Sequence, residues 1–226
     1  MYVVNLINTF MSYIINGNPK TVFIHIPKTA GNAIITGLSK TNNISHIPND
    51  RTVNSNYHST LLDVEKFLSN LENQFIFTVV RNPWDRVSSW FFFRKNILRL
   101  SLKNFEKAVS KKKVINNKSK IQKEYELMCS SFDRWLLTYY EEPWDNTWFS
   151  LSHNQNHWLK GSRVSVDKIV KYETLKEDLK FLNIKLPFTN QSRKTVSTYR
   201  DLYTDNSKNL IYKIYQEDIE EFNYEF

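Results

Sequence analysis

A lysine, a threonine and a glycine follow an apolar run near the N-terminus, in an arrangement that could bind an anion. The run ends at Pro27, and an apolar, helix-compatible segment begins at Ala33. Between them lie Lys28, Thr29 and Gly31. The backbone N–H groups of such a loop and of the first helical turn point at one spot, where the helix dipole also favours negative charge. The pattern predicts a phosphate or sulfate site, although an ordinary strand–turn–helix would look the same locally.

A second segment has the residue types for another phosphate contact. Residues 75–80 form a near-continuous apolar run, as expected for a strand covered on both faces. Arg81 follows the run, and Asn82 and Pro83 are a good N-cap and first helical residue. Ser89 comes two turns into the helix so predicted. An Arg at the end of a strand and a Ser on the next helix can hold one phosphate between them, which makes the pair a candidate second half of the site.

Taken together, the two segments resemble a known family. HIPKTAG followed by VVRNPWDRVSSWF is similar to the carbohydrate sulfotransferases that use 3′-phosphoadenosine 5′-phosphosulfate (PAPS), among them the heparan-sulfate 2-O- and 6-O-sulfotransferases and their bacterial and viral homologues. Further landmarks, His58, Gln155 and the C-terminal segment, follow in the expected order, so that the likeness extends from about residue 21 to residue 226. The alternation of strands and helices favours an α/β fold with a parallel sheet. The resemblance implies a P-loop NTPase-like, three-layer fold with a central parallel sheet flanked by helices.

The resemblance also implies roles for individual residues in sulfuryl transfer to a carbohydrate hydroxyl. Lys28 would stabilise charge on the departing bisphosphate, and Arg81 and Ser89 would hold the 3′-phosphate of PAPS. Ser192 and Arg193 would lie close to the nucleotide. The loop that would cradle the 5′-phosphate comprises Thr29, Ala30, Gly31, Asn32 and Ala33. No metal ion is expected, and the absence of a GK[ST] ending disfavours an ATPase or GTPase.

The loop departs from its relatives at two positions. Asn32 and Ala33 stand where relatives usually carry a pair of hydroxyl residues. The Asn32 amide can still donate to a phosphate, but Ala33 cannot, so we expect weaker donor binding. The departure leaves open an alternative function, that of an inactive protein which binds the nucleotide bisphosphate.

Histidine is the expected general base, because its pKa near 6.5 suits proton abstraction at neutral pH. His58 lies just before a predicted helix and matches a catalytic position of the resembled family, and His46 is the second candidate. His25, inside the first strand, is expected to be structural. His153 and His157 have the spacing of a metal pair but no third ligand, and we expect no metal there.

Composition sets further bounds. A chain of 226 residues suits a single domain over residues 1–226, and its formal charge of +8 implies anionic partners. We expect an anionic nucleotide donor and a carbohydrate acceptor, with the lysines between residues 103 and 123 as one possible acceptor surface. Nucleic-acid binding is a weaker alternative, because no motif that reads RNA or DNA is present. Neither the acceptor's identity nor the oligomeric state can be read from this sequence.

The N-terminal region and the only cysteine complete the expectations. Residues 3–15 are apolar at helical spacing and predict an N-terminal helical extension within residues 1–18, too short to span a bilayer. We therefore expect no transmembrane segment and a cytoplasmic protein, with peripheral membrane attachment through this helix as the alternative. Cys129 excludes an intrachain disulfide and is expected in the core. The other predicted elements are helices near 33–40, 60–71, 121–140, 174–182 and 205–222, a helix after residue 83, strands at 75–80 and 168–172, and an irregular stretch up to residue 57.

Overall fold

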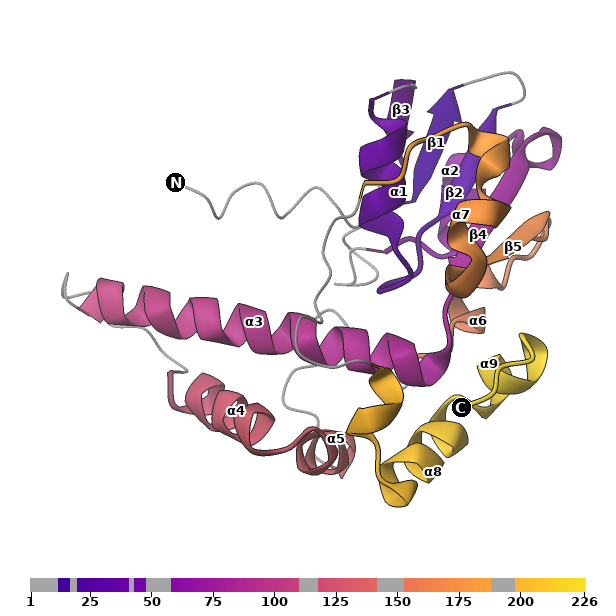
Figure 1. Cartoon of the computed structure of the whole chain (residues 1–226). Coiled ribbons are helices and arrows are strands. Elements are labelled where there is room, and N and C mark those ends of the chain that lie inside the picture. The colour runs from indigo at the N-terminus through magenta and orange to yellow at the C-terminus, as the bar shows by residue number, and fades with distance from the viewer. Residues whose placement is uncertain are drawn as a thin grey trace.

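A five-stranded sheet forms the upper half of the molecule (Figure 1). The computed structural model describes residues 12–16, 20–40, 43–47, 58–109, 118–141, 153–187 and 198–226. Within these ranges the strands follow the order β3-β1-β2-β4-β5. Their bounds are β1 Tyr13–Asn16, β2 Thr21–Ile24, β3 Asn43–His46, β4 Phe75–Val80 and β5 Lys168–Lys171.

The centre of the sheet is parallel, but the sheet as a whole is mixed. Strands β2, β4 and β5 are parallel, whereas β1 runs antiparallel to both β2 and β3. The prediction of a central parallel sheet is therefore confirmed for β2, β4 and β5 and wrong at β1. Only residues 17–20 separate β1 from β2, and a parallel crossover needs a dozen residues or more. A short connection of this kind can join only antiparallel neighbours.

Strand β1 also replaces part of the helix predicted for residues 3–15. Residues 13–16 are extended and pair with β2 on one side and β3 on the other. Aromatic and β-branched side chains favour a strand once two neighbours are present, so pairing overrides the helical spacing. The rest of the predicted N-terminal helix lies outside the described residues. Strand β3 is a second correction, because it falls inside the stretch predicted to be irregular.

The helices follow the predicted positions with local differences. The observed segments are α1 Gly31–Leu38, α2 Leu61–Phe67, α3 Pro83–Val109, α4 Lys118–Ser130, α5 Phe132–Glu141, α6 Asn156–Leu159, α7 Leu175–Asp178, α8 Asp205–Ile214 and α9 Gln216–Glu221. The predicted helix at 121–140 is two helices, α4 and α5, separated at Ser131, and that at 205–222 is divided at Tyr215. The strand predictions at 75–80 and near 168–172 are confirmed.

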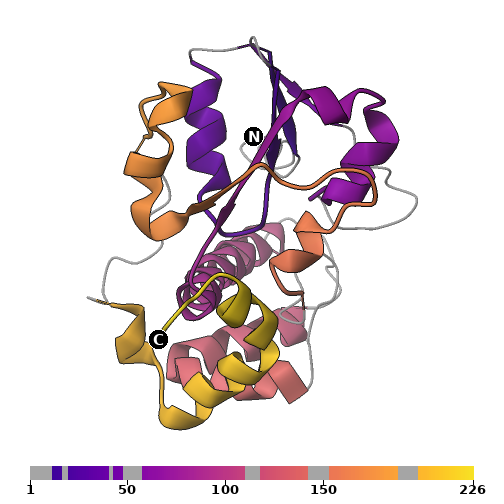
Figure 2. The same ribbon diagram turned by 90° about the vertical axis from the view of Figure 1, so that its right-hand side faces the viewer.

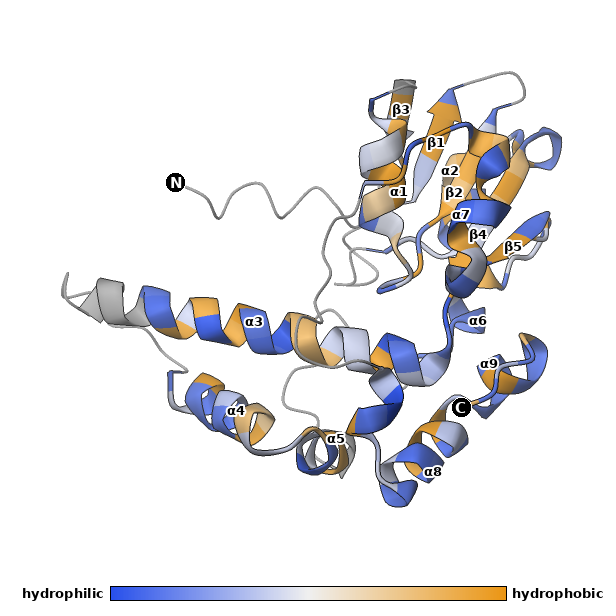
Figure 3. Cartoon of the chain, in the orientation of Figure 1, coloured by the Kyte–Doolittle hydropathy of each residue, from blue (hydrophilic) through white to orange (hydrophobic). Residues whose placement is uncertain are grey.

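Helices cover both faces of the sheet. Figure 2 shows α1 and α7 on one side and α2 on the other. The strands supply the two cores by alternation: Phe23 and Phe77 pack with α1 and α7, whereas Val22 and Ile76 pack with α2. The buried strands accordingly form the most hydrophobic part of Figure 3. This alternation fixes which side chains of each strand face which helices. Because β2 and β4 are parallel neighbours, the loops that follow them emerge at the same edge of the sheet.

A second, helical layer lies below the sheet and is built on α3 (Figure 1). Helices α4, α5 and α8 pack against it through a third core that contains Trp84, Trp135 and Tyr215. The prediction that Cys129 is a core residue is wrong, because Cys129 is exposed. Its neighbour Met128 is the residue of that turn which faces the core. Helix α3 thus links the two layers, and its first turns lie at the edge of the sheet where β4 ends.

Candidate functional site

The loop between β2 and α1 turns through two residues in the left-handed region. Lys28 and Ala30 both have φ of 71°, a conformation that costs energy for residues with a Cβ. The Ala30 carbonyl accepts the first helical bonds, from Ala33 and Ile34. The N–H groups of the preceding helical residues, Gly31 among them, have no acceptor within the helix. The loop therefore presents backbone donors at the N-terminus of α1, as the anion-site prediction requires.

Gly31 is needed for a reason other than the turn. It is not one of the residues with positive φ. A Cβ built on Gly31 would lie 1.9 Å from Nε2 of His25, whose ring occupies that space. The glycine thus allows the His25 imidazole to pack against the start of α1. This contact agrees with the expectation that His25 is a structural residue.

The Thr29 hydroxyl closes the loop. It is buried and donates to the Ile26 carbonyl at 2.9 Å. Its proton is therefore already used within the protein. The loop's backbone N–H groups, together with Lys28, are the donors that remain for an anion.

Two arginines at the start of α3 hold this loop. Arg81 Nη1 donates to the Lys28 carbonyl at 3.1 Å, and Arg86 Nε donates to the Pro27 carbonyl, also at 3.1 Å. Arg86 is only 1% exposed and also donates to the His153 carbonyl. These bonds bring together the two segments in which phosphate contacts were predicted. Sequence reasoning missed Arg86; its only signal was a second arginine five residues after Arg81 in the same motif.

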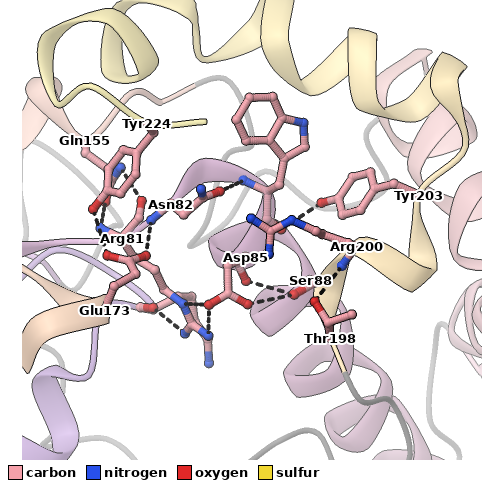
Figure 4. Close-up of polar contacts among 12 residues, drawn as sticks. Arg81, Asn82, Asp85, Ser88, Gln155, Glu173, Thr198, Arg200, Tyr203 and Tyr224 are labelled. Atoms are coloured by element: carbon pink, nitrogen blue, oxygen red, sulfur yellow. Dashed lines mark hydrogen bonds and ion pairs between the residues drawn. The ribbon is translucent and has the colours of Figure 1, made fainter. Parts of the chain in front are cut away.

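The Arg81 guanidinium is fixed from three directions. Its Nε and Nη2 both lie 2.7 Å from Oδ2 of Asp85, which Figure 4 shows beside it. The Tyr172 ring lies under the guanidinium, 3.9 Å from its central carbon to the ring centroid. With the bond to Lys28, these contacts use three of the five N–H groups of the side chain. The remaining edge, formed by Nη1 and Nη2, can still meet a phosphate.

The backbone at this junction is held by residues from distant parts of the chain (Figure 4). Gln155 is fully buried, accepts from the Arg81 N–H at 2.8 Å and donates to the Arg81 carbonyl at 2.9 Å. Glu173 accepts from the Asn82 N–H at 2.9 Å, and the Asn82 amide donates to the Glu225 carbonyl at 2.7 Å. Glu173 thus organises the junction. These hydrogen bonds fix the backbone of Arg81, and so the point from which its side chain extends.

The environment of Lys28 disfavours the protonated form of its amine. Its ammonium lies over the ring of Phe93, 3.8 Å from Nζ to the ring centroid. Burial, and to a smaller extent the nearby charge of Arg81, lower the pKa of Lys28 to about 7. Ser89 lies one turn before Phe93 on α3 and is largely buried. Of the two predicted donor contacts, Arg81, just before α3, bonds to the loop directly, and Ser89 lies on α3 one turn before the residue that contacts Lys28.

His58 meets the same edge of the sheet. It lies just before α2, whose start at Leu61 is fixed by a capping box between Thr60 and Asp63. His58 Nδ1 lies 2.8 Å from the His25 carbonyl. Since a carbonyl only accepts, Nδ1 carries the proton and Nε2 has the lone pair that a general base needs.

The surroundings keep His58 neutral. Burial lowers the pKa of His58 to about 4, the hydrogen bond to the His25 carbonyl raises it in part, and the charges of Arg86 and Lys28 lower it further. The uncharged form is therefore present at neutral pH. It is also the form that can accept a proton.

Some predicted residues lie outside these observations. Ser192 and Arg193 are not among the described residues, and neither is the side chain of His46. The rings of His153 and His157 lie 4.6 Å apart by their centroids. Within the described part of the chain, no three His, Cys, Asp or Glu side chains gather in a way that could hold a metal ion.

Comparison with known families covers both motifs. The model of the sulfotransferase family matches residues 11–225. The chain belongs to the sulfotransferase family. Neither the curated proteins nor the solved structures give a significant match. Among the described helices of this sulfotransferase, none has the length and apolar character that a membrane crossing requires.

Proposed function

We propose that this sulfotransferase takes its sulfuryl group from PAPS and transfers it to a hydroxyl group of a carbohydrate. The observation that supports the donor assignment is the bond from Arg81 to the Lys28 carbonyl. This bond joins the two candidate anion-binding elements, which are the β2–α1 loop and the start of α3. A nucleotide with phosphates at both its 5′ and 3′ positions is the ligand that could use both.

The protein's own groups suit this donor. The N–H groups at the start of α1 would hold the 5′-phosphate, and the open edge of Arg81, with Ser89, would hold the 3′-phosphate. PAPS supplies the activated sulfuryl group. Lys28 would stabilise the negative charge that develops as the bisphosphate leaves, and here its protonated form is required.

Proton removal from the acceptor hydroxyl is assigned to His58. Its Nε2 is the unprotonated nitrogen, and its Nδ1–H is held by the His25 carbonyl. The edge of the His25 ring also packs against it, with ring centroids 4.6 Å apart, and these two contacts orient the imidazole. The carbohydrate class of the acceptor is supported by the resemblance to carbohydrate sulfotransferases, and His58 would act on any hydroxyl brought to it.

The main alternative is a protein that binds the bisphosphate without catalysis. Asn32 and Ala33 favour it, because relatives usually carry hydroxyl groups at these positions. The two functions share the donor site and differ in turnover. Binding and transfer therefore have to be measured separately.

The first experiment compares adenosine 3′,5′-bisphosphate with AMP and ATP in a thermal-shift assay. A ligand at 100 times its dissociation constant stabilises the native state by about 2.7 kcal/mol, which is readily seen as a rise in Tm. We expect a large rise with the bisphosphate and a small one with AMP. Arg81→Met should abolish the difference between the two. Equal shifts with all three nucleotides in the wild-type protein would refute the PAPS assignment.

The second experiment follows radioactive sulfate from PAPS to a panel of acceptors. Neutral and anionic oligosaccharides are compared with simple alcohols, phenols and tyrosine peptides. Transfer to an oligosaccharide, lost in His58→Ala while the bisphosphate still raises Tm, is the expected result. A bisphosphate shift with no transfer to any acceptor would favour the binding protein instead.

A further inference from the structure

The contact between Lys28 and Phe93 has no part in the function described so far. The ammonium lies 3.8 Å from the centroid of the Phe93 ring, within the range of a cation–π interaction. Phe93 comes from α3, and its ring is partly exposed. It is therefore a contact between the loop's charged side chain and a helix of the lower layer.

The position of Phe93 along α3 relates the contact with Lys28 to the residues around Arg81. Asp85, Ser89 and Phe93 are spaced by four residues, so they lie in a row on one face of the helix. Asp85 holds Arg81 at one end of the row, and Phe93 holds the ammonium of Lys28 at the other. At 1.5 Å per residue the ends are about 12 Å apart along the helix axis, with Ser89 between them.

The ammonium of Lys28 is buried close to the charge of Arg81, and its charged form needs a compensating contact. Burial and the charge of Arg81 both act against the charged form of Lys28, as the lowered pKa shows. The negative face of an aromatic ring offsets part of that penalty and favours one position for the ammonium. An aliphatic side chain of similar size would fill the space but would not attract the charge.

We propose that Phe93 is a positioning residue for Lys28, whose ring holds the ammonium at a fixed distance along α3 from Arg81. The inference rests on the proposed function for its kinetic consequence, since Lys28 there stabilises the leaving bisphosphate. Phe93 itself touches no reacting atom. Its ring also packs against that of Trp90, with centroids 5.7 Å apart, so an effect through Lys28 has to be separated from one on packing.

The first test compares Phe93→Leu with Phe93→Tyr in steady-state kinetics with PAPS. Leu removes the aromatic face, and kcat should fall about tenfold, the size expected for one partly desolvated cation–π contact, while KM for PAPS changes less. Tyr keeps the face and should retain most of the activity. Phe92→Leu is the matched control, because Phe92 lies next along α3 and packs against Phe91. Equal losses in all three variants would reduce Phe93 to a packing role and overturn the proposal.

A double-mutant cycle separates action through Lys28 from general damage. In a Lys28→Met background, Phe93→Leu should have no further effect on residual turnover, because the group that it positions is gone. Additive losses in the two variants would contradict the proposal. Far-UV circular dichroism and Tm of each variant establish that the protein compared is folded.

A third measurement needs no donor and remains valid if the proposed function fails. Reductive methylation followed by peptide mass spectrometry reports the pH at which the Lys28 amine becomes reactive, near 7 in the wild type. In Phe93→Leu the space stays filled but the charged form loses the attraction of the ring, so this pH should fall further below the ordinary lysine range, whereas Phe92→Leu should leave it in place. An unchanged Lys28 profile in Phe93→Leu would overturn the proposal, whereas absence of sulfate transfer in the wild type would count only against the proposed function.

Discussion

At the scale of single residues, Lys28 and His58 have pKa values displaced in the same direction with opposite consequences. Burial is the main cause in both, since it disfavours the charged form. In the proposed function His58 acts in its neutral form, which burial favours, but a pKa of about 4 also makes it a weaker base. Lys28 acts there in its charged form, so burial limits the pH range in which it can act.

The pH dependence of kcat/KM follows from these two groups. It should rise as the pH increases through about 4, where His58 loses its proton, and fall as the pH increases through about 7, where Lys28 loses its proton. Bound donor brings negative charge, which favours both protonated forms, so both limbs of the kcat profile should lie at higher pH. Initial rates across pH 4–9, with stability checked at each pH, measure the effect. In Lys28→Arg the fall near pH 7 should disappear, and its persistence would show that another group causes it.

At the scale of elements, a carboxylate on α2 holds the loop that leads into β5. Glu65 accepts hydrogen bonds from the N–H groups of Ser162, Arg163 and Val164, and from the Ser162 hydroxyl. Burial alone would raise the pKa of Glu65, but these hydrogen bonds outweigh it and hold the pKa at about 2. The contact matters for the site because α2 begins just after His58.

Glu65→Gln should lower the free energy of unfolding by about 2 kcal/mol, because it leaves a backbone donor without a charged acceptor. Urea denaturation at pH 7 measures the change. Glu72→Gln is the matched control, since Glu72 pairs with Arg163 at the surface and such pairs contribute about 0–1 kcal/mol. The lowered pKa gives the sign of the pH effect: the stabilisation by Glu65 is complete above about pH 4.5 and is lost as the pH falls toward 2. Equal effects of the two variants would contradict this account.

The elements also show what the sequence can and cannot predict. The strand at 75–80, the helix after Pro83 and the loop at Lys28 depend on local patterns, and they were predicted at the right positions. Strand β1 was not, because its state depends on two partners that its own residues do not reveal. The site divides in the same way. Arg81 could be proposed from its place after a strand, whereas the bond of Arg86 to Pro27 and the contact of Phe93 with Lys28 exist only once the two layers have packed.

At the scale of the whole molecule, α3 belongs to both layers, and a buried ion pair joins it to α4. Arg94 Nε and Nη2 donate to the two carboxylate oxygens of Glu124 at 3.0 and 2.8 Å. The side chains are 10% and 2% exposed. Removing one partner would leave a buried charge, whereas replacing both can be neutral.

Glu124→Gln should therefore destabilise the protein by about 3 kcal/mol or more, and Arg94→Met combined with Glu124→Leu should recover most of the loss. Because α3 also carries Asp85 and Ser89, we expect the sheet and the helical layer to unfold in one transition. Circular dichroism and tryptophan fluorescence, followed together in urea, test both points. Separate transitions for the two signals would show that the layers unfold independently.

The hydrogen bonds around Asn82 also determine when the site can form during synthesis. Its neighbour Arg81 is held by Gln155, 74 positions later in the chain, and Asn82 by Glu173 and Glu225, 91 and 143 positions later. A ribosome makes the loop and the start of α3 long before it makes their supports. The nascent protein therefore carries an incomplete candidate site until these segments have been made, and we expect a nucleotide to bind and aid folding only after the last of them has emerged.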